Sequence, residues 1–411
     1  MRIAIIGAGV VGLATAHALL DRGHEVVLIE PGGMQGRPTD GNAGWIAHTD
    51  IMPLASPKAW RNLPRWLMDP LGPLTIRPGY LPHLTPWLMR FLLASSPSRI
   101  KASIGAIRSI NAESLPAWKN LLASLNLNGH LRENGILSVW RHQGDFLRSQ
   151  DIIERQRGFG VEAHALNPAA LGDLEPALRN VEAAVLYPDA CHVSDPAILA
   201  GDLLRLALDR GAVHVAANAL QIEPKGEFIH VRTDGADQRV AVDQVVISAG
   251  IWSRALAAQL GDRIPLDTER GYNATYTKGR FGIGRPIMFE GEGFVTTPLD
   301  TGDRVGGAVE FAGLEAAPNH SRTDAMVQRL TRFLPHLKAG PAAKRWMGFR
   351  PSIPDSLPVI GPAGRDRRVI YAFGHGHYGL TQAAVTAQMV AVMIEGRPGP
   401  IDPSPFSAQR F

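Results

Sequence analysis

Apolar residues in the first thirty positions fall into a short run, a helical stretch and a second short run. Arg2–Ile6 is a β-branched run that predicts a buried parallel strand. Leu13–Leu20 carries apolar residues at helical spacing, and Asp21–His24 supplies the turn signals that end a helix. Glu25–Ile29 is the second apolar run. The pattern therefore predicts a strand, a helix and a second strand, in that order.

Glycines stand where the first predicted strand gives way to the helix, in G-x-G-x-x-G spacing. Gly7 permits a tight turn, Gly9 lets the backbone approach a pyrophosphate, and Gly12 lets the helix pack closely on the strand. Glu30 ends the second strand, where a carboxylate accepts hydrogen bonds from ribose hydroxyls. The order of these parts predicts a dinucleotide site rather than a glycine-rich turn of packing importance only. The contacts expected here come from Gly7, Ala8, Gly9, Val10, Val11, Gly12 and Glu30.

Two more strand-to-glycine-to-helix junctions lie far along the chain. Val245–Gly250 is a buried-strand signature that runs into a predicted helix at 252–260. Val369–Phe373 is another such run, which meets Gly374–Gly379 and a predicted helix over 381–394. We therefore expect one parallel sheet to be assembled from the start, the middle and the end of the chain.

The region between these junctions alternates apolar and polar residues, as an antiparallel sheet does. The sequence thus predicts an α/β protein, with a Rossmann-like domain built from discontinuous segments and an inserted antiparallel-sheet domain capped by helices. The first domain is expected over 1–56, 144–178, 193–262 and 345–411, and the second over 57–143, 179–192 and 263–344. The strands expected are 135–141, 183–187, 212–216, 221–222, 228–232, 239–242, 266–277, 287–289, 293–298 and 304–310, and the helices are 102–126, 143–157, 196–209 and 323–334.

Composition restricts the function classes. The chain has 411 residues, of which 45% are hydrophobic and 19% charged, and its net charge is only +4. Neither this charge nor any Lys/Arg cluster argues for a nucleic-acid partner. The single Cys191 excludes an internal disulfide framework and a cysteine-only metal site. With neither a signal-peptide pattern nor a long apolar run, the expected location is cytoplasmic, with peripheral attachment to the inner face of the membrane as an option.

Two stretches have open interpretations. The loop after Glu30 contains Asn42, Ala43 and Gly44, and it is either a cofactor contact or a surface connection. Residues 51–101 carry several tryptophans and seven basic residues against one acid. They are either a membrane-surface segment or short helices with tryptophans in the core, and we favour the core because aromatic residues at helical spacing usually pack inside.

Several motifs together resemble the FAD-dependent amine and D-amino-acid oxidoreductase family, which includes D-amino-acid oxidase, glycine oxidase and bacterial D-amino-acid dehydrogenase. The Asn42-Ala43-Gly44 loop is most similar to the dehydrogenase branch. The resemblance spans nearly the whole chain. The matching pieces are GAGVVGLATA at 7–16 with Glu30, Asn42-Ala43-Gly44, VVISAGIWS at 245–253, GFRP with PVIG within 348–361, and GHGHYGLT at 374–381.

The resemblance implies noncovalent FAD, since Cys191 does not match the position of a flavin-linking cysteine. It also implies hydride transfer from an amino-acid Cα to flavin N5. Arg350, in the G-x-R-P motif, is the expected anchor of the substrate carboxylate. The other candidate substrate residues are Tyr272, His48, His377 and Tyr378, and no metal ligands are expected. The remaining FAD contacts expected are Asn42, Ala43, Gly44, Ala249, Gly250, Trp252, Gly374, His375, Gly376, Gly379, Leu380 and Thr381.

Three functions are compatible with these residues. The leading interpretation is a dehydrogenase of a D-amino acid, with cyclic D-proline or hydroxy-D-proline among the candidates, that passes electrons to a quinone or another carrier. The first alternative is a glycine- or sarcosine-type oxidase that uses oxygen and produces hydrogen peroxide. The second is a noncatalytic flavoprotein subunit, against which Arg350 argues, because such a subunit needs no carboxylate anchor.

Overall fold

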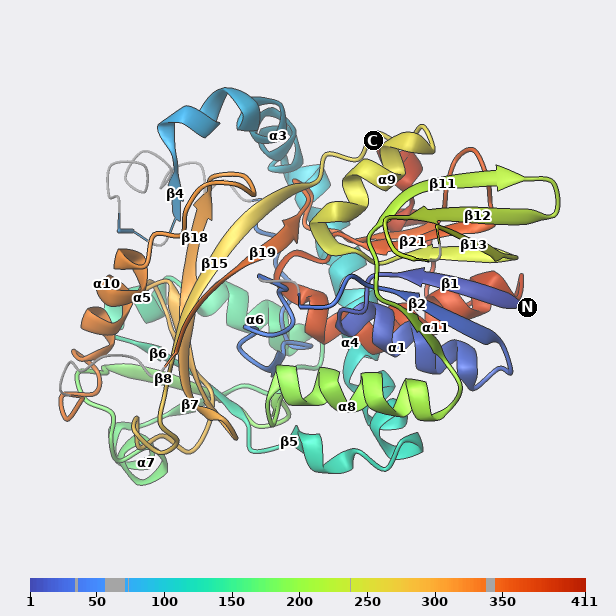
Figure 1. Cartoon of the computed structure of the whole chain (residues 1–411). Coiled ribbons are helices and arrows are strands. Elements are labelled where there is room, and N and C mark those ends of the chain that lie inside the picture. Colours follow the sequence, from blue (N-terminus) through green and yellow to red (C-terminus); the bar gives the residue numbers. More distant parts are fainter. Residues whose placement is uncertain (34–35, 56–70, 73, 237, 338–343) are drawn as a thin grey trace.

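The computed structural model describes residues 1–33, 36–55, 71–72, 74–236, 238–337 and 344–411. Two bodies of structure lie side by side, one around a mostly parallel sheet and one around a larger sheet (Figure 1). The predicted combination of a discontinuous Rossmann-like part and a second part with a mostly antiparallel sheet is confirmed.

The first sheet takes its strands from three distant parts of the chain. Five of its six strands are parallel, and the last pair is antiparallel. Ile3 and Ile5 pack on one face and Ala4 and Ile6 on the other, which is why the run has no polar break. In spatial order the strands are β10 (Val213–Val215), β2 (Glu25–Ile29), β1 (Arg2–Ile6), β14 (Gln244–Ile247), β21 (Val369–Phe373) and β20 (Val359–Pro362).

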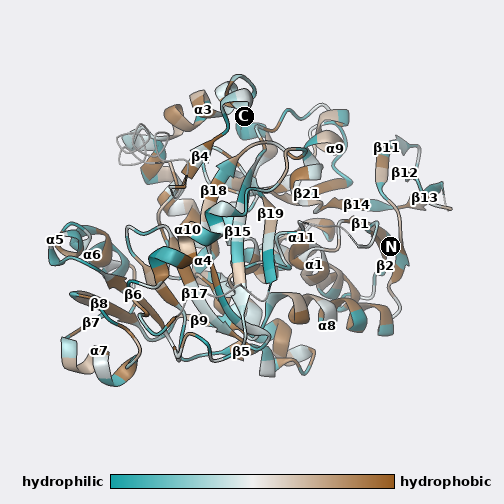
Figure 2. Cartoon of the chain, turned by 60° about the vertical axis from the view of Figure 1, so that its left-hand side comes forward, coloured by the Kyte–Doolittle hydropathy of each residue, from teal (hydrophilic) through white to brown (hydrophobic). Residues whose placement is uncertain are grey.

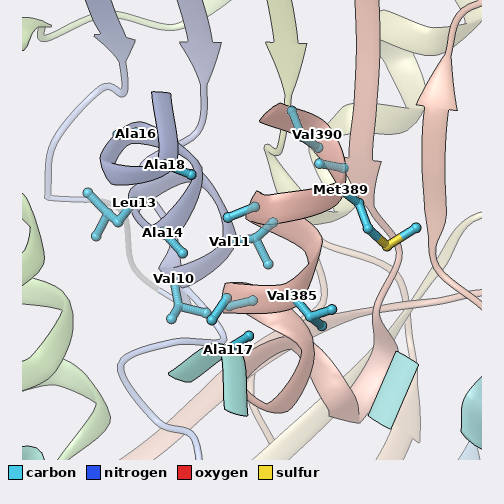
Figure 3. Close-up of a cluster of buried hydrophobic side chains, with 14 of the residues drawn as sticks. Val10, Val11, Leu13, Ala14, Ala16, Ala18, Ala117, Val385, Met389 and Val390 are labelled. Carbon is cyan, nitrogen blue, oxygen red and sulfur yellow. The ribbon is translucent and has the colours of Figure 1, made fainter. Parts of the chain in front are cut away.

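Helices cover one face of this sheet, and they include the two helices that follow glycine-rich junctions. Val11 of α1 faces α11, and Val385 and Val390 of α11 belong to the same hydrophobic core (Figure 3). Trp118 of α4 donates its indole N–H to the carbonyl of Leu380 at 2.8 Å. The helices of this layer are α1 (Val10–Leu20), α4 (Pro97–Ser124), α8 (Pro196–Asp209) and α11 (Gly379–Ile394).

The opposite face is covered by a three-stranded antiparallel sheet and a short helix. Their apolar residues form one core with the alternate residues of β1 and β14. The elements are β11 (Ala219–Lys225), β12 (Phe228–Thr233), β13 (Arg239–Val242), the 3-10 turn η3 (Gly250–Trp252) and α9 (Ser253–Gln259).

The larger sheet has nine strands and a mostly antiparallel pattern. All ten residues of β15 are buried although most are polar, and the strand is coloured largely teal to white (Figure 2). Buried polar side chains need hydrogen-bond partners, and several of those on β15 find them in neighbouring elements. The order is β19 (Lys344–Ser352), β15 (Asp267–Tyr276), β18 (Gly302–Phe311), β17 (Phe294–Leu299), β16 (Ile287–Phe289), β6 (Ile136–Trp140), β8 (Ala183–Tyr187) and β7 (His164–Leu166), with β4 (Leu74–Ile76) beside β18.

The remaining elements flank the larger sheet or join the two parts. β9 pairs with β3 and β5 in a small antiparallel sheet. The helix expected at 143–157 is two helices, and the one expected at 102–126 begins earlier, at Pro97, because proline suits the first turn. These elements are β3 (Trp45–Ile46), β5 (Leu131–Arg132), β9 (Cys191–Val193), α3 (Leu81–Ala94), α5 (Gln143–Leu147), α6 (Gln150–Gly158), α7 (Pro168–Leu174) and α10 (Ser321–Leu330).

Two elements lie on the other side of the expected domain division. β7, in the 144–178 segment assigned to the FAD-binding part, pairs with β8 in the nine-stranded sheet. α4, in the 57–143 segment assigned to the substrate part, packs with α1 and α11. Burial of an apolar face decided the location of α4, and strand pairing decided that of β7, and no local signal in the sequence announces either.

The tryptophan-rich stretch is only partly described. Trp60 and Trp66 lie outside the described residues. Trp87 is buried against Phe91 and Phe311, and its indole N–H donates to the carbonyl of Ser352. The core interpretation therefore holds for Trp87. Over the described part of the chain, no helix combines the length and apolar character needed to cross a membrane.

Candidate active site

A cavity of about 760 Å³ lies between the carboxyl ends of the parallel strands and the face of the nine-stranded sheet. Its walls come from the glycine-rich turn after β1, the loop after β2, the junctions after β14 and β21, and strands β15 to β19. Ligands in open α/β sheets bind outside the carboxyl ends of the strands, so the position fits a dinucleotide site.

The three glycines after β1 each have a physical reason. Gly7 has a φ of 101°, and a Cβ there would lie 2.7 Å from the carbonyl oxygen of Ser248. A Cβ on Gly12 would lie 2.0 Å from the carbonyl oxygen of Gly7, which requires glycine for close helix–strand packing. At Gly9 the nearest neighbour, Thr39 Oγ1, would be at an ordinary 3.5 Å. Since Gly9 lines the cavity, its glycine is explained by close approach of a ligand.

Glu30 lies at the nucleotide end of the cavity. Its Oε2 accepts a hydrogen bond from the Ala8 N–H at 2.9 Å, and Oε1 lies 3.8 Å from Arg37 Nη1. Thr39 Oγ1 accepts from the Val10 N–H at 3.1 Å. Arg37 and Thr39 line the cavity and were not among the predicted residues, although their glycine-rich loop was a candidate cofactor contact.

The loop at 41–44 is fastened to the large sheet by two polar side chains. Asn273 of β15 donates to the carbonyl of Gly41 at 2.7 Å, and Arg304 of β18 donates to that of Asn42. Asn42 Oδ1 in turn accepts from the Gly44 N–H at 2.8 Å. The loop is therefore a wall of the cavity, with Asn42 and Ala43 on its lining, rather than a free surface connection.

The junction before α11 forms another part of the cavity wall. Gly374 and Gly376 have φ values of 82° and 55°, and both line the cavity together with His375, Gly379 and Leu380. Behind the lining, Thr381 Oγ1 accepts from the Ala47 N–H at 3.0 Å. The N-terminus of α11 thus points at the cavity and favours negative charge there.

His375 serves this junction structurally. Its Nε2 lies 3.0 Å from Thr386 Oγ1, and burial lowers the pKa of the imidazole to about 3. The ring is therefore neutral at physiological pH. The cavity also receives Ala249, Gly250 and Trp252 from the second junction, as expected.

Arg350 lies on β19 with its guanidinium against Gly271, where a Cβ would come within 2.6 Å of Cζ. It faces the cavity, and no described residue accepts a hydrogen bond from its guanidinium. Burial lowers the pKa of this guanidinium, and Glu269, its register partner on β15, raises it. A half-buried arginine whose guanidinium has no partner among the described residues is suited to bind a carboxylate bidentately.

His377 lies beside this arginine. It lines the cavity, and burial together with the charge of Arg350 lowers the pKa of its imidazole to about 4. The ring is therefore neutral, so it can accept or donate one hydrogen bond without competing with Arg350 for a bound carboxylate.

The other predicted substrate residues have different surroundings. Tyr272 borders the cavity, but its hydroxyl donates to Glu310 and accepts from the Asn319 N–H at 3.1 Å. Tyr378 donates to the carbonyl of Met52 and is not on the lining.

His48 is also off the lining. Its Nδ1 lies 3.2 Å from the Ile46 carbonyl, and the charges that act on it are Asp189 and Lys119. Neither His48 nor Tyr378, which ends η4 (Gly376–Tyr378), lies on the cavity lining, and their contact with substrate stays a prediction.

Further lining residues were missed, and three of them show why. Trp346 is inserted between Gly41 and Gly348, whose Cβ atoms would lie within about 2 Å of its ring. Ala308 has a φ of 50° at a bulge opposite β15. Asp50 follows β3 and opens on the cavity. No local sequence signal marks these positions, since each depends on contacts between distant segments.

The comparisons with known proteins agree over the full length. A family model described as "FAD dependent oxidoreductase" (DAO) matches residues 2–393. A D-amino-acid oxidase of Bradyrhizobium diazoefficiens is 36% identical, over 100% of this chain and 98% of its own. A D-amino acid dehydrogenase of Dechloromonas aromatica is 28% identical, over 97% of each chain.

Solved structures show the same fold. Glycine oxidase from Bacillus cereus superposes with a TM-score of 0.75 at 21% identity, covering 96% of this chain and 95% of its own. L-Proline dehydrogenase from P. horikoshii gives 0.75 at 20%, covering 100% and 97%. With the glycine cradle, Glu30 and the α11 junction around one cavity, these matches lead to one conclusion: the chain belongs to the DAO family of FAD-dependent oxidoreductases.

Proposed function

We propose that this protein oxidises the Cα–N bond of a D-amino acid and passes the electrons to a quinone or another carrier. The observation that carries the proposal is Arg350, a half-buried guanidinium without a hydrogen-bond partner among the described residues, on the cavity that holds the FAD fingerprint. The relatives named D-amino-acid oxidase and dehydrogenase support the stereochemistry and the substrate class.

The residues of the cavity fit FAD. Gly9 leaves room for a pyrophosphate, Glu30 Oε1 faces the nucleotide end beside Arg37, and the α11 N-terminus offers positive potential. When bound, FAD would supply the hydride acceptor, flavin N5. We infer noncovalent binding, because Cys191 is buried in β9 and is not on the cavity lining, and burial raises the pKa of its thiol to about 12.

The chain's own groups would orient the substrate. Arg350 would hold the α-carboxylate bidentately, which limits rotation of the molecule and aims Cα. Neutral His377 beside it would accept one hydrogen bond from the amine without adding charge. Trp346 and the β15–β18 wall would exclude water from the reacting bond.

An oxidase is the second candidate, because the relative of 36% identity is named a D-amino-acid oxidase. A cyclic substrate such as D-proline is a further candidate. Its oxidation would give a cyclic imine, which would be released with its ring intact. The noncatalytic subunit is disfavoured by Arg350, which would be costly to bury without a ligand.

The test is anaerobic addition of D- and L-amino acids to the purified flavoprotein. The proposal expects bleaching of the flavin absorbance by D-amino acids only, and little peroxide when the reaction is repeated in air with an artificial acceptor as control. Peroxide formation at the turnover rate would favour the oxidase. A preparation without flavin, or a flavin reduced by no D-amino acid, would reject the proposal.

Peripheral membrane contact is compatible with a quinone acceptor. Helix α3 exposes Leu81, Met89, Leu92 and Leu93 together with Arg90. An apolar helix face with a basic residue suits an anionic lipid surface. Sedimentation with vesicles containing phosphatidylglycerol checks this, and a Met89→Glu/Leu93→Glu variant that still sediments would contradict it.

A further inference from the structure

A second hollow, of about 230 Å³, lies between α3 and α9. No described residue lines both this hollow and the active-site cavity. Helix α9 separates the two, because Ala255 and Leu256 line the cavity whereas Arg254 and Ala258, one turn apart, line the hollow. A ligand in the hollow would therefore not compete with FAD or substrate for space.

The floor of the hollow is buried protein. Trp87 of α3 stacks on Phe91 with ring centroids 5.2 Å apart, and its indole N–H donates to the carbonyl of Ser352. Leu266 and Asp267, where β15 begins, also line the hollow and are buried. The floor is thus held by the same packing that holds α3 on the nine-stranded sheet.

Three arginines from three segments line the hollow: Arg90 of α3, Arg254 of α9 and Arg263 of the loop after α9. All three are exposed, and no described residue forms an ion pair with them or accepts a hydrogen bond from their guanidinium groups. By contrast, the exposed Arg205 of α8 pairs with two acids. Three cations around one small hollow repel one another, so a bound anion would be favoured there.

The two acids that line the hollow are already engaged by neutral donors. Both oxygens of Asp267 accept from the Tyr80 hydroxyl, at 2.9 and 3.1 Å. Asp262 accepts from the Tyr371 hydroxyl at 2.7 Å and from Gln409 Nε2 at 3.0 Å. The guanidinium N–H groups of the three arginines therefore remain free to bind an external anion.

We propose that this hollow binds a phosphate group through Arg90, Arg254 and Arg263. A guanidinium fork matches two oxygens of a phosphate, and a tetrahedral phosphate has oxygens enough for more than one arginine. The hollow is several times larger than the roughly 30 Å³ that one water occupies, which leaves room for a phosphate with a small organic group attached. The phosphate can belong to a soluble compound or to the headgroup of an anionic lipid. This inference does not depend on the proposed reaction.

Helix α3 gives the lipid source a structural basis. It lies at the outer edge of the molecule (Figure 1). Leu81, Met89 and Leu93 are exposed at helical spacing on one face, and Trp87 and Arg90 line the hollow from a neighbouring face. A lipid whose acyl chains contact the first face would bring its phosphate to the second.

The experiment measures binding of inorganic phosphate to the holoenzyme by calorimetry at constant ionic strength, with chloride as the reference anion. Arg254→Gln and Arg263→Gln should each weaken phosphate binding on the order of 10-fold, the loss expected for one charge-assisted contact. Arg155→Gln removes the same charge from an exposed position on α6 and should bind phosphate as wild type does. In the second arm, the same proteins are sedimented with vesicles of phosphatidylglycerol or of phosphatidylcholine.

The two arms distinguish the sources of the phosphate. Phosphate binding without sedimentation assigns the site to a soluble compound. Sedimentation with phosphatidylglycerol that Arg254→Gln weakens and free phosphate reverses assigns it to a lipid headgroup. The inference is wrong if neither phosphate nor phosphatidylglycerol binds in a way that depends on Arg254 and Arg263. That case includes sedimentation that only Met89→Glu/Leu93→Glu abolishes, and phosphate that binds no better than chloride.

Discussion

Gly12 and Gly7 approach so closely that a Cβ on Gly12 would lie 2.0 Å from the carbonyl oxygen of Gly7. Gly12→Ala should therefore separate α1 from β1 and destabilise the fold by about 3 kcal/mol or more. Thermal melting and the yield of yellow, folded protein measure this.

Gly9→Ala is the matched comparison. Gly9 has an ordinary extended backbone (φ −72°, ψ 176°), and its Cβ would meet Thr39 Oγ1 at 3.5 Å. The apoprotein should fold with less than about 1 kcal/mol of change. FAD binding should weaken on the order of tenfold or more, about 1.4 kcal/mol, as followed by flavin fluorescence. Equal effects of the two substitutions on folding would refute the separate roles.

Arg350→Ala should retain flavin and lose substrate affinity. Removing one partner of a buried charge-assisted pair costs on the order of 2–5 kcal/mol of binding. The loss of affinity should appear as a higher substrate concentration for the half-maximal rate of flavin reduction. Arg345→Ala is the control, because Arg345 lies on the same strand but pairs with Asp324 at the surface. Unchanged kinetics in Arg350→Ala would exclude the carboxylate role.

Tyr272→Phe tests whether this hydroxyl contacts substrate. The hydroxyl bridges Glu310 and the Asn319 N–H, so its loss should lower stability by about 1–2 kcal/mol and leave kcat/KM nearly unchanged. A large fall in kcat/KM with an unchanged Tm would instead support the carboxylate contact expected from the family resemblance.

Ala308→Gly should stabilise the protein. Ala308 has a φ of 50°, a region that costs a residue with a Cβ about 1–2 kcal/mol and glycine almost nothing. Part of that gain is offset by the greater chain entropy of glycine when unfolded, which leaves a net gain below about 1 kcal/mol. Ala274→Gly, in the interior of neighbouring β15, should destabilise. Two losses of Tm of similar size would contradict the strain at Ala308.

Asp50→Asn should raise stability in a pH-dependent way. The pKa of this carboxyl is raised from 3.8 to about 7, so between these values the folded protein keeps a proton that the unfolded chain has released. The contribution of the Asp50 carboxyl to the free energy of unfolding therefore becomes less favourable as pH rises through this window. The titratable groups around it are Glu290, Tyr187 and Tyr378.

The advantage of Asp50→Asn over wild type should grow from about pH 5 to about pH 8, where it is on the order of 1–4 kcal/mol. Melting curves of the substrate-free holoenzyme measure it, with Asp173→Asn, which removes the same charge from an exposed position on α7, as the control. An advantage of the same size at both pH values would show that Asp50 titrates normally.

The sequence by itself determined the elements whose signals are local. The glycine spacing, the β-branched runs and the position of Glu30 depend on neighbours in the chain, and they correctly predicted the first strand–helix–strand unit, both later junctions and the FAD class. The G-x-R-P motif likewise pointed to Arg350, which the structure places on the cavity.

Only the tertiary structure decided which side chains face the cavity. Tyr272 is adjacent to the site, yet its hydroxyl donates its hydrogen bond to Glu310, which lies 38 residues away in the sequence. His48 and Asp50 stand two residues apart on one turn, which is hydrogen-bonded to α4 and α6, and Asp50, not His48, is on the lining. Such choices depend on the burial of distant surfaces against each other, which a pattern along the chain does not record.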